Sequence, residues 1–148
     1  MRALFTRRQL QSAERQAAFY ARYKNIGRLA YRADRGGRAN ARSRLTTHER
    51  IILLVGELEA DVNNGGFSQY LGNKGRRRAQ AALRALLNIG AKKIARWLAS
   101  ALQSDATAGT LEQLDRRFFD QPEDLPSLVM KHLAPITKRS LRVRVPER

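Results

Sequence analysis

Hydrophobic side chains recur every three or four positions along most of the 148 residues, which is the spacing of amphipathic helices. Six apolar stripes of this kind predict an all-α fold, a single-domain bundle of about six helices with a basic N-terminal helix and a basic C-terminal tail. The stripes consist of Phe19, Tyr23, Ile26 and Ala30; Ile51, Leu54, Val55, Leu58 and Val62; Ala79, Ala82, Leu83, Leu86 and Ile89; Ile94, Trp97, Leu98, Ala101 and Leu102; Leu111, Leu114 and Phe118; Leu125, Leu128, Val129 and Leu133.

The second of these helices has a strong start signal. In the run Thr-Thr-His-Glu at residues 46–49, the Thr46 hydroxyl can accept the Glu49 amide while the Glu49 side chain reaches back to the Thr46 amide. This capping box predicts that a helix begins near Thr47. A similar pair, Thr110 and Gln113, predicts the start of a later helix. Gly90, directly after the third stripe, predicts a helix end, and Glu123 and Asp124 are well placed for the positive N-terminal end of the last helix.

The same helix has an equally strong stop. Residues 63–66 read Asn-Asn-Gly-Gly, and these residue types tolerate positive φ better than others do. Phe67 and Tyr70 follow three positions apart, so a short helical turn would direct both rings toward a core. Residues 72–75 (Gly-Asn-Lys-Gly) predict a further break before the next long helix.

The stripes and breaks divide the chain into four parts. We expect a basic helix over residues 1–34, a flexible Arg/Gly linker over residues 35–45, a helical domain over residues 46–135 and a basic tail over residues 136–148. The linker is as typical of a solvated loop as of a segment that binds nucleic acid without sequence preference. No apolar run reaches the roughly 18 residues of a membrane span.

A formal net charge of +16 narrows the classes of partner. So basic a chain repels itself unless anions are nearby, which makes polyanions the expected partners. Residues 1–45 carry most of the excess, with 12 Lys/Arg and 2 Asp/Glu. Because an arginine side chain can donate two hydrogen bonds to one phosphate, we predict nonspecific, salt-sensitive nucleic-acid binding. The alternative for the N-terminal helix is a surface helix whose aromatic stripe packs on the core. The predicted contacts are Arg22, Lys24, Arg28, Arg32, Arg35, Arg38, Arg42, Arg44, Lys74, Arg76, Arg77 and Arg78.

Residues suited to catalysis or metal binding are few. The chain has no cysteine, and its two histidines, His48 and His132, lack the spacing of a metal-binding pair. Glu57 and Asp61 share one helix face while Glu59 points elsewhere, which argues against a single acidic site. The sequence therefore predicts no enzyme activity, no cofactor and no metal. We expect a cytoplasmic protein; the alternative is that the Arg-rich, acid-poor start is an organellar transit peptide.

One segment resembles a known family. The residues that carry the resemblance are the run Asn63-Asn64-Gly65-Gly66-Phe67-Ser68-Gln69-Tyr70, flanked by Glu59, Asn73 and Gly75, and the later run Leu-Asp-Arg-Arg-Phe-Phe at residues 114–119. Over about residues 49–135 the chain is similar to the bacterial DNA-mimic-protein-like family of helical proteins. The resemblance implies a structural or partner-binding role for the matching positions. These are Glu59, Asn63, Asn64, Gly65, Gly66, Phe67, Gln69 and Tyr70.

The family takes its name from proteins that imitate DNA to block a DNA-binding regulator. Such imitation requires a dense negative surface, whereas this chain is strongly positive, so the resemblance contributes a helical scaffold rather than a function. We predict a non-enzymatic binding protein that binds nucleic acid through its arginine-rich surfaces. The alternative is a protein-interaction module, such as a regulator, antitoxin or immunity protein, that binds an acidic partner. A homodimer is compatible with both.

Overall fold

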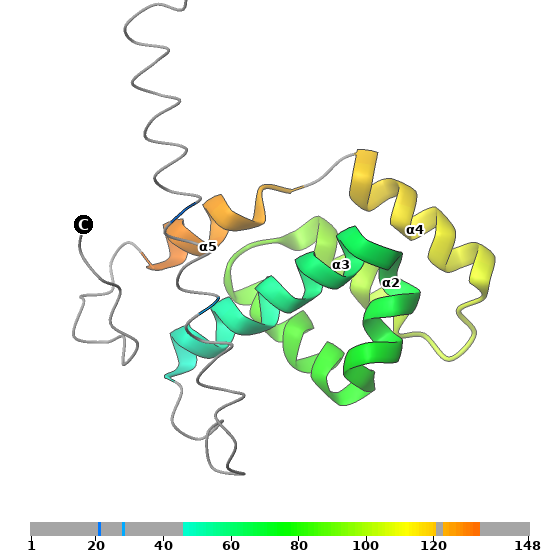
Figure 1. The fold of residues 1–148 in the computed structure, drawn as a ribbon, viewed down its shortest axis with the longest axis horizontal. Helices are drawn as coiled ribbons and strands as arrows, with labels where there is room; N and C mark the ends of the chain where they lie inside the picture. The colour runs from blue at the N-terminus through cyan, green and yellow to red at the C-terminus, as the bar shows by residue number, and fades with distance from the viewer. Residues whose placement is uncertain (1–20, 22–27, 29–45, 121–122, 134–148) are drawn as a thin grey trace, which may run out of the picture.

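The computed structural model describes residues 21, 28, 46–120 and 123–133. Residues 21 and 28 are helical, and residues 46–120 and 123–133 form four helices and no strand: α2 (Thr47–Asn88), α3 (Lys92–Ala101), α4 (Ala108–Asp120) and α5 (Leu125–Leu133) (Figure 1). The all-α prediction is confirmed for this part of the chain. The count of about six helices is not confirmed, because the described residues form four helices, although the longest of them, α2, contains non-helical glycines at both predicted breaks. The predicted linker, most of the N-terminal helix and the basic tail lie outside the described residues.

The start of α2 follows the predicted capping box. Oγ1 of Thr46 accepts a hydrogen bond of 3.2 Å from the amide of Glu49, and Oε1 of Glu49 accepts one of 2.9 Å from the amide of Thr46. Two of the four orphan amides at this end of the helix are thereby satisfied. The Glu49 side chain is fully buried, so the cap also seals this end of the core.

Two glycine breaks divide α2 into helical segments 47–64, 67–74 and 76–88. Gly66 and Gly75 have φ of 78° and 77°, in the region that favours glycine, and Gly65 next to the first break is also non-helical. The chain changes direction at each break, so α2 winds around α3 (Figure 1). The second break occurs at Gly75 alone, while Gly72 and Asn73 keep helical backbone conformations.

Gly90 ends α2, as its position after the apolar stripe predicted. Its φ is 80°, its amide donates to the carbonyl of Leu87, and the amide of Ala91 donates to the carbonyl of Leu86. These two bonds form a Schellman motif, which satisfies the last carbonyls of a helix. The chain can therefore enter α3 after only three residues.

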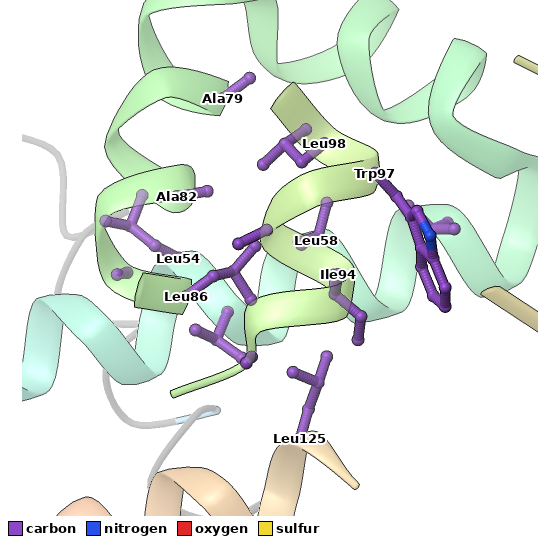
Figure 2. Packing of buried hydrophobic residues seen from close by; sticks show 14 of the residues in the cluster. Leu54, Leu58, Ala79, Ala82, Leu86, Ile94, Trp97, Leu98 and Leu125 are labelled. Carbon is purple, nitrogen blue, oxygen red and sulfur yellow. The ribbon is translucent and has the colours of Figure 1, made fainter. Parts of the chain in front are cut away.

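The core lies where the segments of α2 enclose α3. Leu54 and Leu58 of the first segment, Leu86 of the third and Leu98 of α3 gather in one buried cluster (Figure 2). Each such side chain contributes about 1.5–3 kcal/mol by burial. Most of the predicted stripe positions between residues 51 and 133 are buried, so their apolar spacing identified the core. Among the described residues, no helix has the length and apolar character needed to cross a membrane.

The caps of α4 and α5 differ in how well they were predicted. Oγ1 of Thr107 accepts the Thr110 amide at 3.2 Å, so α4 begins before the predicted pair Thr110 and Gln113, and that prediction is wrong. Thr107 takes the role because it directly precedes the first helical residue. Asp124 caps α5 as its sequence position predicted, because its carboxylate accepts the Ser127 amide at 3.1 Å.

Candidate functional site

The first break in α2 is fixed from outside, by α4. The amide of Phe67, the first residue of the segment 67–74, donates a hydrogen bond of 2.8 Å to Oδ1 of Asp115. A Cβ on Gly66 would overlap the Asp115 carboxylate, so glycine is needed both for its positive φ and for this close approach. A carboxylate 48 positions away in sequence thus caps the segment.

The other polar positions of the motif divide into packed and exposed ones. A Cβ on Gly65 would overlap the side chain of Gln69, which folds back over the glycine. Asn63 and Asn64 are exposed, and Glu59 is half-buried on α2. The glycines are therefore explained by packing, whereas the two asparagines are the motif positions that face solvent most directly.

Phe67 and Tyr70 anchor the turn in the core, as predicted. Both residues are fully buried. The ring of Phe67 meets Phe118 of α4 edge to face, with ring centroids 5.9 Å apart and an interplanar angle of 89°. A hydrogen bond and an aromatic contact to the same helix hold the turn, so this part of the motif serves the fold.

A largely buried ion pair joins two segments of α2. Glu57 accepts hydrogen bonds of 2.6 Å from Nε and 2.7 Å from Nη2 of Arg78, and Nζ of Lys74 lies 3.9 Å from its Oε1. The Glu57 side chain is only 8% exposed. Two-pronged contacts of this kind are strong and geometrically specific. The carboxylate therefore pairs with Arg78 and also lies near Lys74, two side chains that were predicted to contact nucleic acid.

The remaining arginines of the run 74–78 differ from each other. Arg76 donates through Nη2 to the carbonyl of Leu102 at the C-terminal end of α3, where the helix dipole favours a cation. This contact explains an arginine at the start of segment 76–88, whose own dipole opposes it. Arg77 is exposed and makes no ion pair with any described residue. Arg77 is therefore the one cationic member of the run 74–78 that has no partner among the described residues.

The structure describes one of the predicted N-terminal contacts. Arg28 is helical and exposed. The others lie outside the described residues: Arg22, Lys24, Arg32, Arg35, Arg38, Arg42 and Arg44.

A basic depression lies between α3 and α4. Its volume is about 340 Å³, and its lining consists of Lys93, Arg96 and Trp97 from α3 and of Arg117 and Asp120 from α4. That volume is at the small end of the range of about 300–1,000 Å³ that is usual for ligand pockets. Figure 2 shows Trp97 on the side of α3 that faces away from Leu86. We call these five residues the α3–α4 depression.

The lining cations of the depression have no counter-ion among the described residues. By contrast, Arg116 of α4, one position before Arg117, forms an ion pair of 2.8 Å with Glu112. Three positive side chains thus converge on a concave surface that holds a single carboxylate, Asp120. This site was not predicted from the sequence, although two signals pointed to it: Arg96 next to Trp97 in α3, and Arg117 and Asp120 three positions apart in α4.

A carboxylate from the connection between α4 and α5 binds the N-terminal end of α3. Oε1 and Oε2 of Glu123 accept hydrogen bonds of 3.0 Å each from the amides of Lys93 and Ile94. An acidic side chain at a helix N-terminus is favoured by the dipole. Glu123 was expected to serve α5, but it binds α3 and so holds the backbone that carries Lys93 and Arg96.

Residues 43–137 match the protein family described as DMP19-like protein. The match covers more than half of the 148 residues and contains all four described helices. The chain belongs to the DMP19-like family. No curated protein and no solved structure matches the chain. The family assignment agrees with the resemblance carried by the Asn-Gly-Gly-Phe turn.

Charge is divided unevenly between the DMP19-like segment and the rest of the chain. Residues 43–137 hold 13 Lys/Arg and 10 Asp/Glu, whereas the remaining residues hold 16 Lys/Arg and 3 Asp/Glu. Most of the net charge of +16 therefore lies outside the DMP19-like segment. Because the segment has only a small excess of Lys/Arg, a positively charged site within it depends on where the cations lie and not on their number.

The two histidines of this DMP19-like protein lie side by side. The rings of His48, in the first turn of α2, and His132, in the last turn of α5, have centroids 5.8 Å apart. Among the described residues, no group of three histidine or carboxylate side chains is placed to hold a metal ion. The pair joins α5 to the start of α2.

Alanine at Gly66 should destabilise the protein by more than about 2 kcal/mol, because backbone strain and a clash with Asp115 both oppose the new Cβ. Gly75→Ala tests backbone strain without a clash, since φ is positive but no atom lies within 4 Å of the new Cβ, and should lower the free energy of unfolding by about 1–2 kcal/mol.

Gly72→Ala is the matched control. Its site is open and its backbone is helical, so the free energy of unfolding should rise by up to about 1 kcal/mol. Urea denaturation measures all three; equal losses at Gly66 and Gly75 would contradict the role of Asp115.

Alkaline titration should identify Tyr70 among the four tyrosines. Burial, and next the negative charge of Glu57, raise the pKa of the Tyr70 hydroxyl. The folded state binds this proton more tightly than the unfolded state does. The protonated hydroxyl therefore adds to the free energy of unfolding below pH about 10, the ordinary tyrosine pKa, and this addition is lost as the pH rises further. In ultraviolet titration Tyr70→Phe should remove the last tyrosine ionisation of the folded protein. Simultaneous ionisation of all tyrosines before unfolding would be inconsistent with the buried hydroxyl.

Proposed function

We propose that this DMP19-like protein is a non-enzymatic binding protein whose helical domain binds an acidic partner protein at the α3–α4 depression. The observation that carries the proposal is the convergence of Lys93, Arg96 and Arg117, which lack counter-ions among the described residues, on one concave surface. A partner carboxylate placed there gains charge-assisted hydrogen bonds without displacing an internal ion pair.

The composition of the depression is typical of protein interfaces. Arginine and tryptophan are the residue types that most often dominate binding energy, and Arg96 lies directly beside Trp97. Asp120 adds a hydrogen-bond acceptor at the same surface, which favours a partner that offers donors next to its acids. Positive charge at the rim also speeds the encounter with an acidic protein.

Charge distinguishes this proposal from imitation of DNA. The DMP19-like segment has more Lys/Arg than Asp/Glu, and its exposed depression is lined by three cations. A surface of this sign complements the acidic side of a partner rather than its DNA-binding side. The proposed partner is therefore an acidic protein, bound without chemical change.

Neutralising two lining arginines should weaken this binding selectively. The full chain carrying Arg96→Gln and Arg117→Gln should lose about 10-fold to 100-fold in affinity for an acidic protein that the unchanged chain captures from a cell extract. The control chain carries Arg77→Gln and Arg84→Gln, which remove the same charge from exposed positions outside the depression. Purified partner and isothermal titration calorimetry give the affinities. An equal loss in both variants would leave only general electrostatic attraction and would refute a site at the depression.

The segregation of charge favours a second binding function, in which the basic segments outside residues 43–137 contact nucleic acid. These segments hold 16 Lys/Arg against 3 Asp/Glu, and their arginines suit phosphate. The cations of the helical domain contribute less, because Lys74, Arg76 and Arg78 already have partners inside the protein.

A salt series with labelled duplex DNA and single-stranded RNA tests this second function. The logarithm of affinity should fall steeply with the logarithm of salt concentration for the full chain, with a slope of about −0.9 per phosphate contacted on duplex DNA. A chain beginning at Leu45, checked for helicity by circular dichroism, should show a much shallower slope. Absence of binding by the full chain at low salt would overturn the nucleic-acid function and leave the acidic-partner function untouched.

A further inference from the structure

The charge balance of the α3–α4 depression suits a doubly negative group better than a single carboxylate. Three cations and one carboxylate line it, which leaves two positive charges in excess. The nearby carboxylate of Glu123 is engaged by two backbone amides at the end of α3. A single carboxylate would leave one of these excess charges without a partner, whereas a phosphate monoester carries about two negative charges at pH 7.

The cations approach the depression from two helices. Lys93 and Arg96 are three positions apart on α3, and Arg117 comes from α4. Side chains three apart lie on one face of a helix, so the two helices present their cations across the same hollow. Guanidinium groups on opposite sides can each form a two-pronged contact with a tetrahedral phosphate, which has three terminal oxygens to accept them.

Trp97 supplies an apolar patch beside the cations. The residue is only 8% exposed, so only a small part of the indole borders the depression. An aromatic ring can pack against a small part of another ring in an edge-to-face contact. A nucleobase that binds by stacking would need the open face. The patch therefore favours a phosphate carried on a ring that contacts tryptophan from the side.

We infer that the α3–α4 depression receives the side chain of a phosphotyrosine residue on the acidic partner, with its phosphate held by Lys93, Arg96 and Arg117 and its ring against Trp97. This inference rests on the proposed function and specifies the partner's chemistry. Phosphoserine would supply the same dianion but would leave the exposed part of Trp97 without a contact. Asp120 accepts a hydrogen bond from the partner's backbone and disfavours further acids at that side.

Trp97 is the only tryptophan of the chain, so its fluorescence reports occupancy of the depression directly. The full chain is titrated with phenyl phosphate, with phenyl sulfate, which has the same shape but one negative charge, and with inorganic phosphate, which lacks the ring. At pH 7.5 phenyl phosphate should bind about tenfold more tightly than either of the others. Its advantage over phenyl sulfate should vanish near pH 5, below the second phosphate pKa of about 6. Calorimetry measures the same affinities independently of fluorescence.

Variants place the binding at the depression. Arg96→Gln and Arg117→Gln should each weaken phenyl phosphate about tenfold, because each removes a charge-assisted contact. Arg84→Gln, at an exposed position outside the depression, should leave the affinity unchanged. These exposed side chains form no ion pair with any described residue, and thermal melting checks that each variant is folded.

The possible failures are distinguishable. Equal affinity for phenyl sulfate and phenyl phosphate, with both lost on Arg96→Gln, overturns the phosphotyrosine inference but leaves a site for acidic partners. Tighter binding of adenosine monophosphate than of phenyl phosphate also overturns it, in favour of a nucleotide ligand. If no aryl anion binds while an acidic partner protein still requires Arg96 and Arg117, the inference fails and the proposed function stands.

Discussion

The contact between α4 and the first break of α2 is the constraint on which the rest of the structure depends. A helix of 42 residues would be a rod if it continued without interruption, and no core would form around it. Gly66 allows the chain to turn, and the Asp115 carboxylate stabilises the turned state by capping the new segment. The third segment of α2 can then return and enclose α3 together with the first. The apolar stripes are buried only because this turn brings them together.

Much of the fold could be predicted from short-range signals. The Thr46–Glu49 box, the Gly90 stop and the apolar stripes between residues 51 and 133 act over one or two helical turns, and the predictions from these signals are confirmed. The contact of Asp115 with the Phe67 amide joins residues 48 apart, and Glu123 reaches back to α3 across about 30 residues. Nothing in the sequence next to an acidic residue indicates which distant helix N-terminus it will cap. Such pairings follow from the tertiary arrangement, so sequence reasoning could not supply them.

The same limit applied to the candidate site. The charge runs in the sequence identified where cations are dense, but not which cations are already neutralised. Glu57 lies two helical segments away from Arg78 along α2, and their two-pronged pairing removes a predicted contact from the surface. Lys93, Arg96 and Arg117 looked like ordinary solvated residues because their convergence depends on how α3 and α4 pack. The sequence therefore showed where cations are dense, but not which of them are paired with a carboxylate in the folded protein.

α4 has two duties on neighbouring faces. Asp115 and Phe118 hold the turn of α2, and Arg117 and Asp120, interleaved with them in the sequence, line the depression. The rotation of α4 about its axis is therefore set by the scaffold contacts before any ligand is considered. A relative that keeps the turn inherits the position and outline of the hollow, and it can change what the hollow accepts by substitutions at four or five lining positions. In such proteins the Asn-Gly-Gly-Phe motif would indicate that the depression is present, whereas the residues that line it would indicate which ligand it binds.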